Sequence, residues 1–193
     1  LQGRRIVVGE TGGIAALIDT LARRLRADGA EVLTLHQPDL SAQAKTANEW
    51  DGAVYLGVTL AAEDLSVAYF QTEGFVSAGG RGLAEHASHA LVGPLDTPHP
   101  AVGMRIPILR ETRMPAVWCR VGEPARVVER VPALALSLRD ALARWCDRPV
   151  LRADYPLSPF SPRVSQRMSA VHPPSFPQAG VCVCVTNVTH THT

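Results

Sequence analysis

Two short apolar segments, residues 4–8 and 31–35, flank a stretch in which apolar residues recur at helical spacing. Charged residues occupy the other side of that stretch, which predicts an amphipathic helix. Its apolar residues are Ile14, Leu17, Ile18, Leu21, Ala22 and Leu25. Gly29 follows the helix and is typical of a left-handed cap. A strand, a helix and a strand in this order predict a parallel strand pair joined by a right-handed crossover.

The remaining chain continues the alternation of strands and helices. Residues 53–58 are almost wholly apolar, which is typical of a central strand. Further elements are expected as a short helix at 41–49, a strand at 66–71, a helix at 81–91, a Pro-rich loop at 93–103, a strand at 115–121, and a helical region at 125–145 that breaks at Pro132. We therefore expect an α/β fold, a single domain over residues 1–148, with a mostly parallel twisted sheet and helices on both faces.

The chain changes character at Pro149. Repeated prolines argue against regular structure after this point, and the last residues alternate as Val-Cys and Thr-His, as translations of a dinucleotide repeat would. We expect residues 149–193 to be a disordered low-complexity tail or a frameshift or read-through product. A Cys/His metal-binding tail is the alternative. The chain begins with Leu1 rather than Met, so we expect the natural N-terminus to be missing.

Charge and cysteine content exclude several classes of partner. The net charge of +1 gives no general electrostatic reason to expect nucleic acid or an anionic membrane surface. No apolar run is long enough to span a bilayer. The four cysteines have neither metal-ligand spacing nor the density of a disulfide scaffold, so we interpret them as isolated thiols.

The strand at residues 115–121 carries an unusual charge near its end. Pro115 opens the strand and Gly122 closes it, and the carboxyl end of such a strand is where α/β sheets place their chemistry. Arg120 lies near that end, and Arg110 and Arg113 precede the strand. If the three arginines converge, they form a cationic pocket for a carboxylate or phosphate. The alternative is that Arg120 pairs with a buried carboxylate such as Glu10 or Asp51.

Glycine-rich loops and histidines offer weaker candidates. The loops at 9–13 and 77–82 each lead into a helix and could bind an anion, but we interpret both as ordinary tight turns. His86 and His89 share the polar side of one helix and are interpreted as solvated side chains rather than metal ligands. His36 ends a strand, where a structural or surface role is favoured over a place at a pocket edge.

Several segments match a known family in order and spacing. They are residues 1–8, 21–35, 47–51, 67–70, 82–85 and 109–117. In these segments the chain resembles the zinc-dependent N-acetylmuramoyl-L-alanine amidases, and in particular the subgroup that follows peptidoglycan-binding repeats. The resemblance implies a hydrolase that cuts the bond between a peptidoglycan sugar and its stem peptide. Such an enzyme holds zinc through His, Glu and His, and a further Glu acts as general base.

The positions that the resemblance assigns to this chemistry carry other residues. The turn at 9–13 has no His, and Glu10 is the only carboxylate nearby. The segment that should supply the Glu ligand is deleted, so that Ile14 or a neighbour stands there. The third strand ends at residues 57–58 without a His. Arg120 stands at the general-base position, and a guanidinium cannot accept the proton.

These substitutions lead to the hypothesis of a degenerate amidase-like domain with no metal cofactor. Its ligand-binding candidates are Arg110, Arg113, Arg120 and Glu10. It would bind a peptidoglycan fragment or precursor, or a cell-wall synthesis protein, in cell-wall metabolism or its regulation. One alternative is an active amidase that holds zinc through displaced ligands, and another is a damaged gene fragment. A hydrolase would lie in the cell envelope and a regulator in the cytoplasm.

Overall fold

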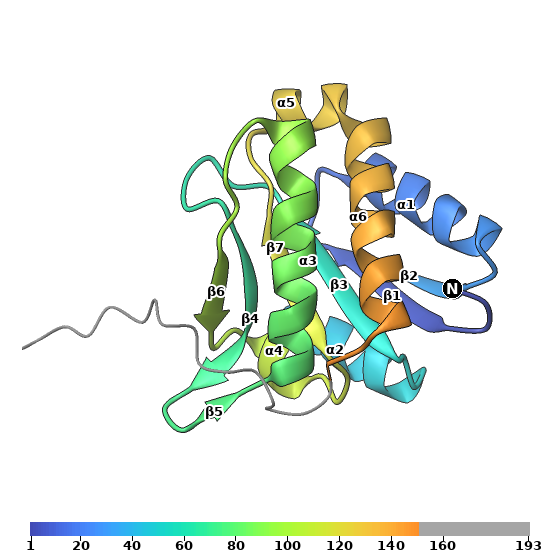
Figure 1. Cartoon of the computed structure of the whole chain (residues 1–193), viewed down its shortest axis with the longest axis vertical. Coiled ribbons are helices and arrows are strands. Elements are labelled where there is room, and N and C mark those ends of the chain that lie inside the picture. The colour runs from blue at the N-terminus through green and yellow to red at the C-terminus, as the bar shows by residue number, and fades with distance from the viewer. Residues whose placement is uncertain (151–193) are drawn as a thin grey trace, which may run out of the picture. The chain divides into compact units, whose positions relative to one another are not determined.

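The computed structural model describes residues 1–150, and the predicted tail from residue 151 onward lies outside this range. Strands and helices alternate along most of these residues (Figure 1). The strands are β1 (Arg5–Glu10), β2 (Glu31–His36), β3 (Val54–Thr59), β4 (Ser66–Thr72), β5 (Phe75–Val76), β6 (Ala101–Met104) and β7 (Ala116–Arg120). The helices are α1 (Ala15–Ala27), α2 (Leu40–Glu49), α3 (Ala78–Leu95), α4 (Pro107–Glu111), α5 (Pro124–Glu129) and α6 (Val131–Asp147).

The strands form one seven-stranded sheet in the order β2-β1-β3-β7-β4-β5, with β6 paired to β4 on a branch from this path. The strands β2, β1, β3 and β7 are parallel to one another. β4 runs antiparallel to β7, and β6 runs parallel to β4. The predicted β1–α1–β2 crossover is confirmed, and so is the mostly parallel α/β sheet.

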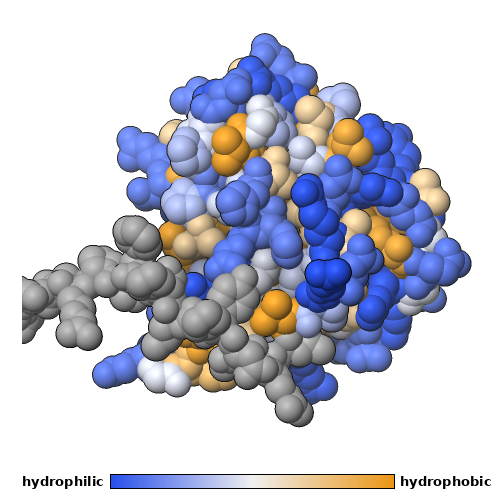
Figure 2. Space-filling model, viewed as in Figure 1, coloured by the Kyte–Doolittle hydropathy of each residue, from blue (hydrophilic) through white to orange (hydrophobic). Residues whose placement is uncertain are grey.

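Helices cover both faces of the sheet, as the alternating pattern predicts. On one face, α1, α3 and α6 lie side by side over the apolar side chains of the central strands (Figure 1). On the other face, α2 and α4 pack against a smaller core that includes Tyr55 and Trp118. The outer surface of the α3 and α6 layer is mainly hydrophilic, with isolated apolar residues (Figure 2). Such scattered apolar residues are usual on a folded domain.

Several elements differ from the sequence prediction, and β5 and α4 were not expected. The helix expected at 81–91 extends from Ala78 to Leu95, because Ser77 caps its start and accepts a hydrogen bond from the backbone N–H of Gly80. The Pro-rich loop expected at 93–103 contains β6, which adds to the edge of β4. β6 has only four residues, follows Pro100 and contains Gly103, so it gives no periodic signal and its pairing with β4 decides this strand.

The break predicted at Pro132 is confirmed, because α5 ends at Glu129 and α6 begins at Val131 with proline in its first turn. In residues 1–150 there is no helix with the length and apolar character needed to cross a membrane.

Candidate functional site

The carboxyl ends of four parallel strands meet at one edge of the sheet. In register order, His36 ends β2 beside Glu10 of β1, and Thr59 of β3 lies beside Arg120 of β7. The turn after β1 and the start of α1 lie at the same edge. Ligands of open α/β sheets bind outside the carboxyl ends of the strands, so we call this set of strand ends the carboxyl edge.

Glu10 is buried at the carboxyl edge and has defined partners. Its carboxylate accepts a hydrogen bond from the backbone N–H of Gly12, and its Oε1 lies 3.2 Å from Nδ1 of His36. The Nε2 of His36 lies 3.5 Å from Oδ1 of Asp19 on α1. The imidazole therefore bridges a buried carboxylate and an exposed one. This arrangement compensates the burial of Glu10, because a buried charge is stable only when it is hydrogen-bonded or paired.

Two threonines meet at the middle of the carboxyl edge. The hydroxyl oxygens of Thr11, in the turn after β1, and Thr59, at the end of β3, are 2.9 Å apart. β3 extends one residue beyond the predicted strand, so its last side chain at the edge is Thr59. The resemblance assigns one histidine ligand to the turn after β1 and the other to the end of β3. In this structure a hydrogen bond between two threonine hydroxyl groups joins these two places.

Arg120 lies at the end of β7 and contacts the loop before β4. Its guanidinium donates to the carbonyl of Glu63 at 3.3 Å and lies 3.8 Å from the carboxylate of Asp64. The alternative, in which Arg120 pairs with Glu10 or Asp51, is wrong, because Glu10 contacts His36 and Asp51 pairs with Arg5 at the opposite end of the sheet. The Arg120 side chain is 29% exposed, so water reaches this cation.

A buried hydrogen-bond network supports the carboxyl edge from the α2 side. The amide group of Gln43 donates to the carbonyls of Glu10 and Gln37, at 3.0 and 2.6 Å. Its carbonyl oxygen accepts a hydrogen bond from the hydroxyl of Tyr55 at 2.7 Å. Burial raises the pKa of Tyr55, so its hydroxyl keeps its proton. Gln43 thereby holds the chain segments that follow β1 and β2 in place.

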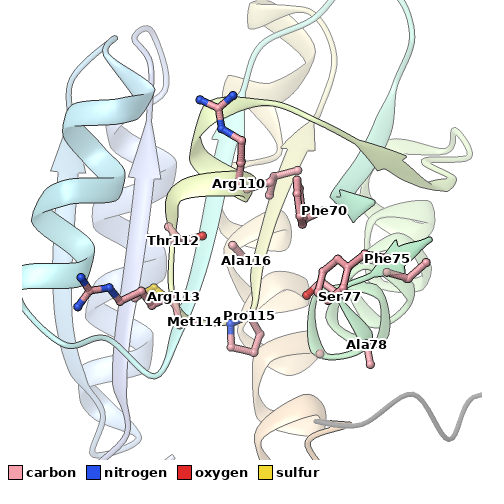
Figure 3. A pocket seen from close by; sticks show the side chains of 13 residues that line it. Phe70, Phe75, Ser77, Ala78, Arg110, Thr112, Arg113, Met114, Pro115 and Ala116 are labelled. Carbon is pink, nitrogen blue, oxygen red and sulfur yellow. The ribbon is translucent and has the colours of Figure 1, made fainter. Parts of the chain in front are cut away.

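Arg110 and Arg113 lie at the other end of the sheet, before the first residue of β7. They line a groove of about 530 Å³ between α4, β5 and the start of α3 (Figure 3). Because Arg120 is the last residue of β7, it lies at the opposite end of that strand from this groove. The three arginines therefore do not converge on a common pocket. The length of β7 fixes this separation, since its two ends lie at opposite edges of the sheet.

The other candidates occupy structural positions. Gly79 and Gly80 lie in the first turn of α3, and Gly9 and Glu10 belong to β1, so neither predicted loop keeps its expected limits. His89 is exposed, whereas His86 is half-buried. Burial, followed by the nearby Arg144, holds the pKa of His86 below its usual value.

Sequence reasoning missed Asp19, Gln43 and Thr59 as parts of this edge. Asp19 and Gln43 read as ordinary polar residues of amphipathic helices, and nothing in their spacing connects them to a strand end. Thr59 lies one residue beyond the predicted strand. Thr59 would have been found if every residue just after a parallel strand were taken as a site candidate.

Comparison with solved structures shows which known proteins share this fold. N-acetylmuramoyl-L-alanine amidase AmiC2 of Nostoc punctiforme superimposes with a TM-score of 0.64 and 16% identity, over 77% of this chain and 100% of that chain. The N-acetylmuramoyl-L-alanine amidase from Clostridium difficile gives 0.63 and 16% identity, over 76% and 99%. Ami1 from Mycobacterium abscessus gives 0.61 and 11% identity, over 76% and 100%. The chain therefore has the fold of the catalytic domains of these amidases.

At the level of sequence, no protein-family model matches the chain, and no curated protein matches it either. The similarity therefore concerns the path of the backbone.

The metal-binding side chains at the carboxyl edge are Glu10, His36 and Asp19, and they contact one another. In the part of the chain that the structure describes, no three His, Cys, Asp or Glu side chains are grouped to hold a metal. His36 directs both ring nitrogens toward carboxylates, so neither is free for a metal. Arg120 adds a positive charge that repels a divalent cation.

Proposed function

We propose that this chain is an amidase-fold domain that binds in cell-wall metabolism or its regulation and has lost zinc-dependent hydrolysis. The observation that carries the proposal is the set of residues at the carboxyl edge, where Thr11 and Thr59 share a hydrogen bond and Arg120 ends β7. None of these side chains is a zinc ligand of the usual kind or a general base at neutral pH.

The ligand that this edge supports best is a peptidoglycan fragment or precursor. Arg120 offers a solvent-accessible guanidinium, which suits the carboxylates of a stem peptide or the phosphates of a precursor. The contact of Arg120 with Asp64 is at 3.8 Å, and Asp64 is mostly exposed, so a ligand anion can replace this pair at small cost. Backbone groups and the two threonine hydroxyls would contribute polar contacts beside it.

A protein of cell-wall synthesis is the other class of partner for the domain. CwlD from Clostridioides difficile, which has a TM-score of 0.55 to this chain, was solved in complex with the GerS lipoprotein. This precedent supports a protein-bound amidase fold, although the identity between the two chains is only 11%.

The alternative function is an active amidase with displaced ligands. Glu10, His36 and Asp19 are the carboxylates and imidazole that such a site would have to use, because they meet at the carboxyl edge. To bind zinc, His36 would have to release one of its two carboxylate contacts.

Metal analysis and a cleavage assay separate the two functions. We expect the purified full chain to hold far less than one zinc per molecule and to leave peptidoglycan uncut, while it co-sediments with insoluble peptidoglycan. The variant Arg120→Ala should weaken this co-sedimentation, and Arg23→Ala on the outer side of α1 is the matched control. Stoichiometric zinc, with cleavage abolished by a chelator, would establish the alternative. Absence of both binding and cleavage would refute peptidoglycan as the ligand of this edge.

A gain-of-function variant tests whether Thr11 and Thr59 stand at the positions of the two histidine ligands. Because Thr11 and Thr59 have adjacent hydroxyl groups, the double substitution Thr11→His and Thr59→His should raise zinc affinity above that of the parent chain. The added Arg120→Glu should not restore cleavage unless metal binding is restored first.

A further inference from the structure

The groove at the amino end of β7 has an aromatic wall that is exposed to solvent. Phe70 of β4 and Phe75 of β5 form a tilted ring pair with centroids 5.8 Å apart, and Phe75 is 55% exposed. Met114 and Pro115 line the facing wall (Figure 3). The volume of about 530 Å³ lies in the range of about 300–1,000 Å³ that is usual for binding sites.

The charged side chains that line the groove have one sign. Arg110 and Arg113 are its ionisable residues, and no Asp or Glu among residues 1–150 lines it. Arg110 pairs with Glu111 at 2.6 Å, so a carboxylate of the partner would compete with Glu111 for this guanidinium. No ion pair joins the Arg113 guanidinium to a carboxylate within the described residues. The rim of this groove is therefore complementary to negative charge.

The direction of the two guanidinium groups indicates the size of the partner. Both extend away from the middle of the groove, so in this arrangement they do not meet on one anion inside it (Figure 3). A small carboxylate would leave at least one of them without a contact. A chain that places an apolar side chain in the groove and acidic residues on either side can reach both, in the usual pattern of an apolar centre with a charged rim.

From these observations we infer that the groove binds an acidic peptide segment that carries a large apolar side chain, supplied by a partner protein. The apolar side chain packs between Phe75 and Pro115, and flanking carboxylates pair with Arg110 and Arg113. This site lies at the opposite end of the sheet from Arg120. The inference therefore goes beyond the proposed function and does not depend on it.

The experiment measures fluorescence anisotropy of a labelled probe peptide, acetyl-Asp-Glu-Trp-Leu-Asp-Glu-amide, with the full chain. We expect saturable binding that weakens as salt is added, because the rim pairs are exposed. The variants Phe75→Ser and Arg110→Glu/Arg113→Glu should each weaken binding roughly tenfold, as loss of an anchor side chain does.

Matched controls keep the experiment specific. Val128→Ser removes an apolar side chain on α5 that is 60% exposed, and Arg23→Glu reverses an exposed charge on α1. Both should bind the probe like the parent chain. Equal binding by Phe75→Ser and Val128→Ser would overturn the inference, as would no binding at millimolar concentration. A dimer that Phe75→Ser abolishes, without binding of the probe, would also overturn it and indicate a second copy of the chain.

Discussion

The network around Gln43 predicts a large and non-additive loss of stability. Gln43→Leu keeps a side chain of similar size but leaves the Tyr55 hydroxyl without its acceptor and the Gln37 carbonyl without this donor. The Glu10 carbonyl still accepts the backbone N–H of Gln37 at 3.3 Å. Each buried polar group that loses its partner costs about 1–3 kcal/mol, so we expect a loss of about 2–6 kcal/mol in the free energy of unfolding.

The second substitution in this double-mutant cycle is Tyr55→Phe, which leaves the side-chain carbonyl of Gln43 without its donor. It should lower the free energy of unfolding by about 1–3 kcal/mol. In the double variant the hydroxyl and its acceptor are both absent. The combined loss should therefore fall below the sum of the single losses by at least about 1 kcal/mol. Urea unfolding of the full chain, followed by tryptophan fluorescence, measures these differences at constant m value.

Tyr69→Phe is the matched control for this cycle. The Tyr69 hydroxyl also donates to a glutamine, Gln71, at 3.0 Å, but Gln71 is exposed and water can replace the bond. This control should lower stability by no more than about 0.5 kcal/mol. Two results would refute the reasoning: a Gln43→Leu loss no larger than the control, or single losses that add within about 0.3 kcal/mol.

Three further predictions concern stability. The pKa of His86 is lowered in the folded chain, mainly by burial, so the unfolded chain binds more protons. Stability should therefore fall as the pH drops below 6.5. His86→Gln should flatten this dependence of stability on pH in urea titrations at several pH values. The pKa of Asp28 is lowered by its hydrogen bonds from Arg139, so the stability from this pair should be present above pH 3.8 and lost as the pH falls below it. Asp28→Asn should lower the free energy of unfolding by about 1 kcal/mol at pH 7 and by almost nothing near pH 2. Gly57→Ala should destabilise the chain by about 1–3 kcal/mol in thermal unfolding, because an added Cβ would lie 2.2 Å from the ring of Trp118, and a neutral result would contradict the packing at this position.

Local periodicity determined the layered α/β architecture. Apolar residues at helical spacing before Gly29, and the apolar run at 53–58, predict their elements without reference to the rest of the chain. Pro and Gly likewise mark the limits of β7, because each restricts or frees the backbone at its own position. These signals depend on neighbours in sequence, and they are correct here for the parallel strands and for the helices on both faces of the sheet.

Tertiary structure alone decided which side chains meet at the carboxyl edge. Glu10 and His36 are 26 residues apart, Thr11 and Thr59 are 48 apart, and Arg120 reaches a carbonyl 57 residues away. These contacts depend on strand order, register and the length of each strand. The same geometry places Arg110 and Arg113 at the opposite end of β7 from Arg120, although all three lie within eleven residues of sequence. Each residue adds about 3.3 Å along a strand, so residues that are close in sequence can lie at opposite ends of it. Pairing between strands instead brings together residues that are far apart in sequence.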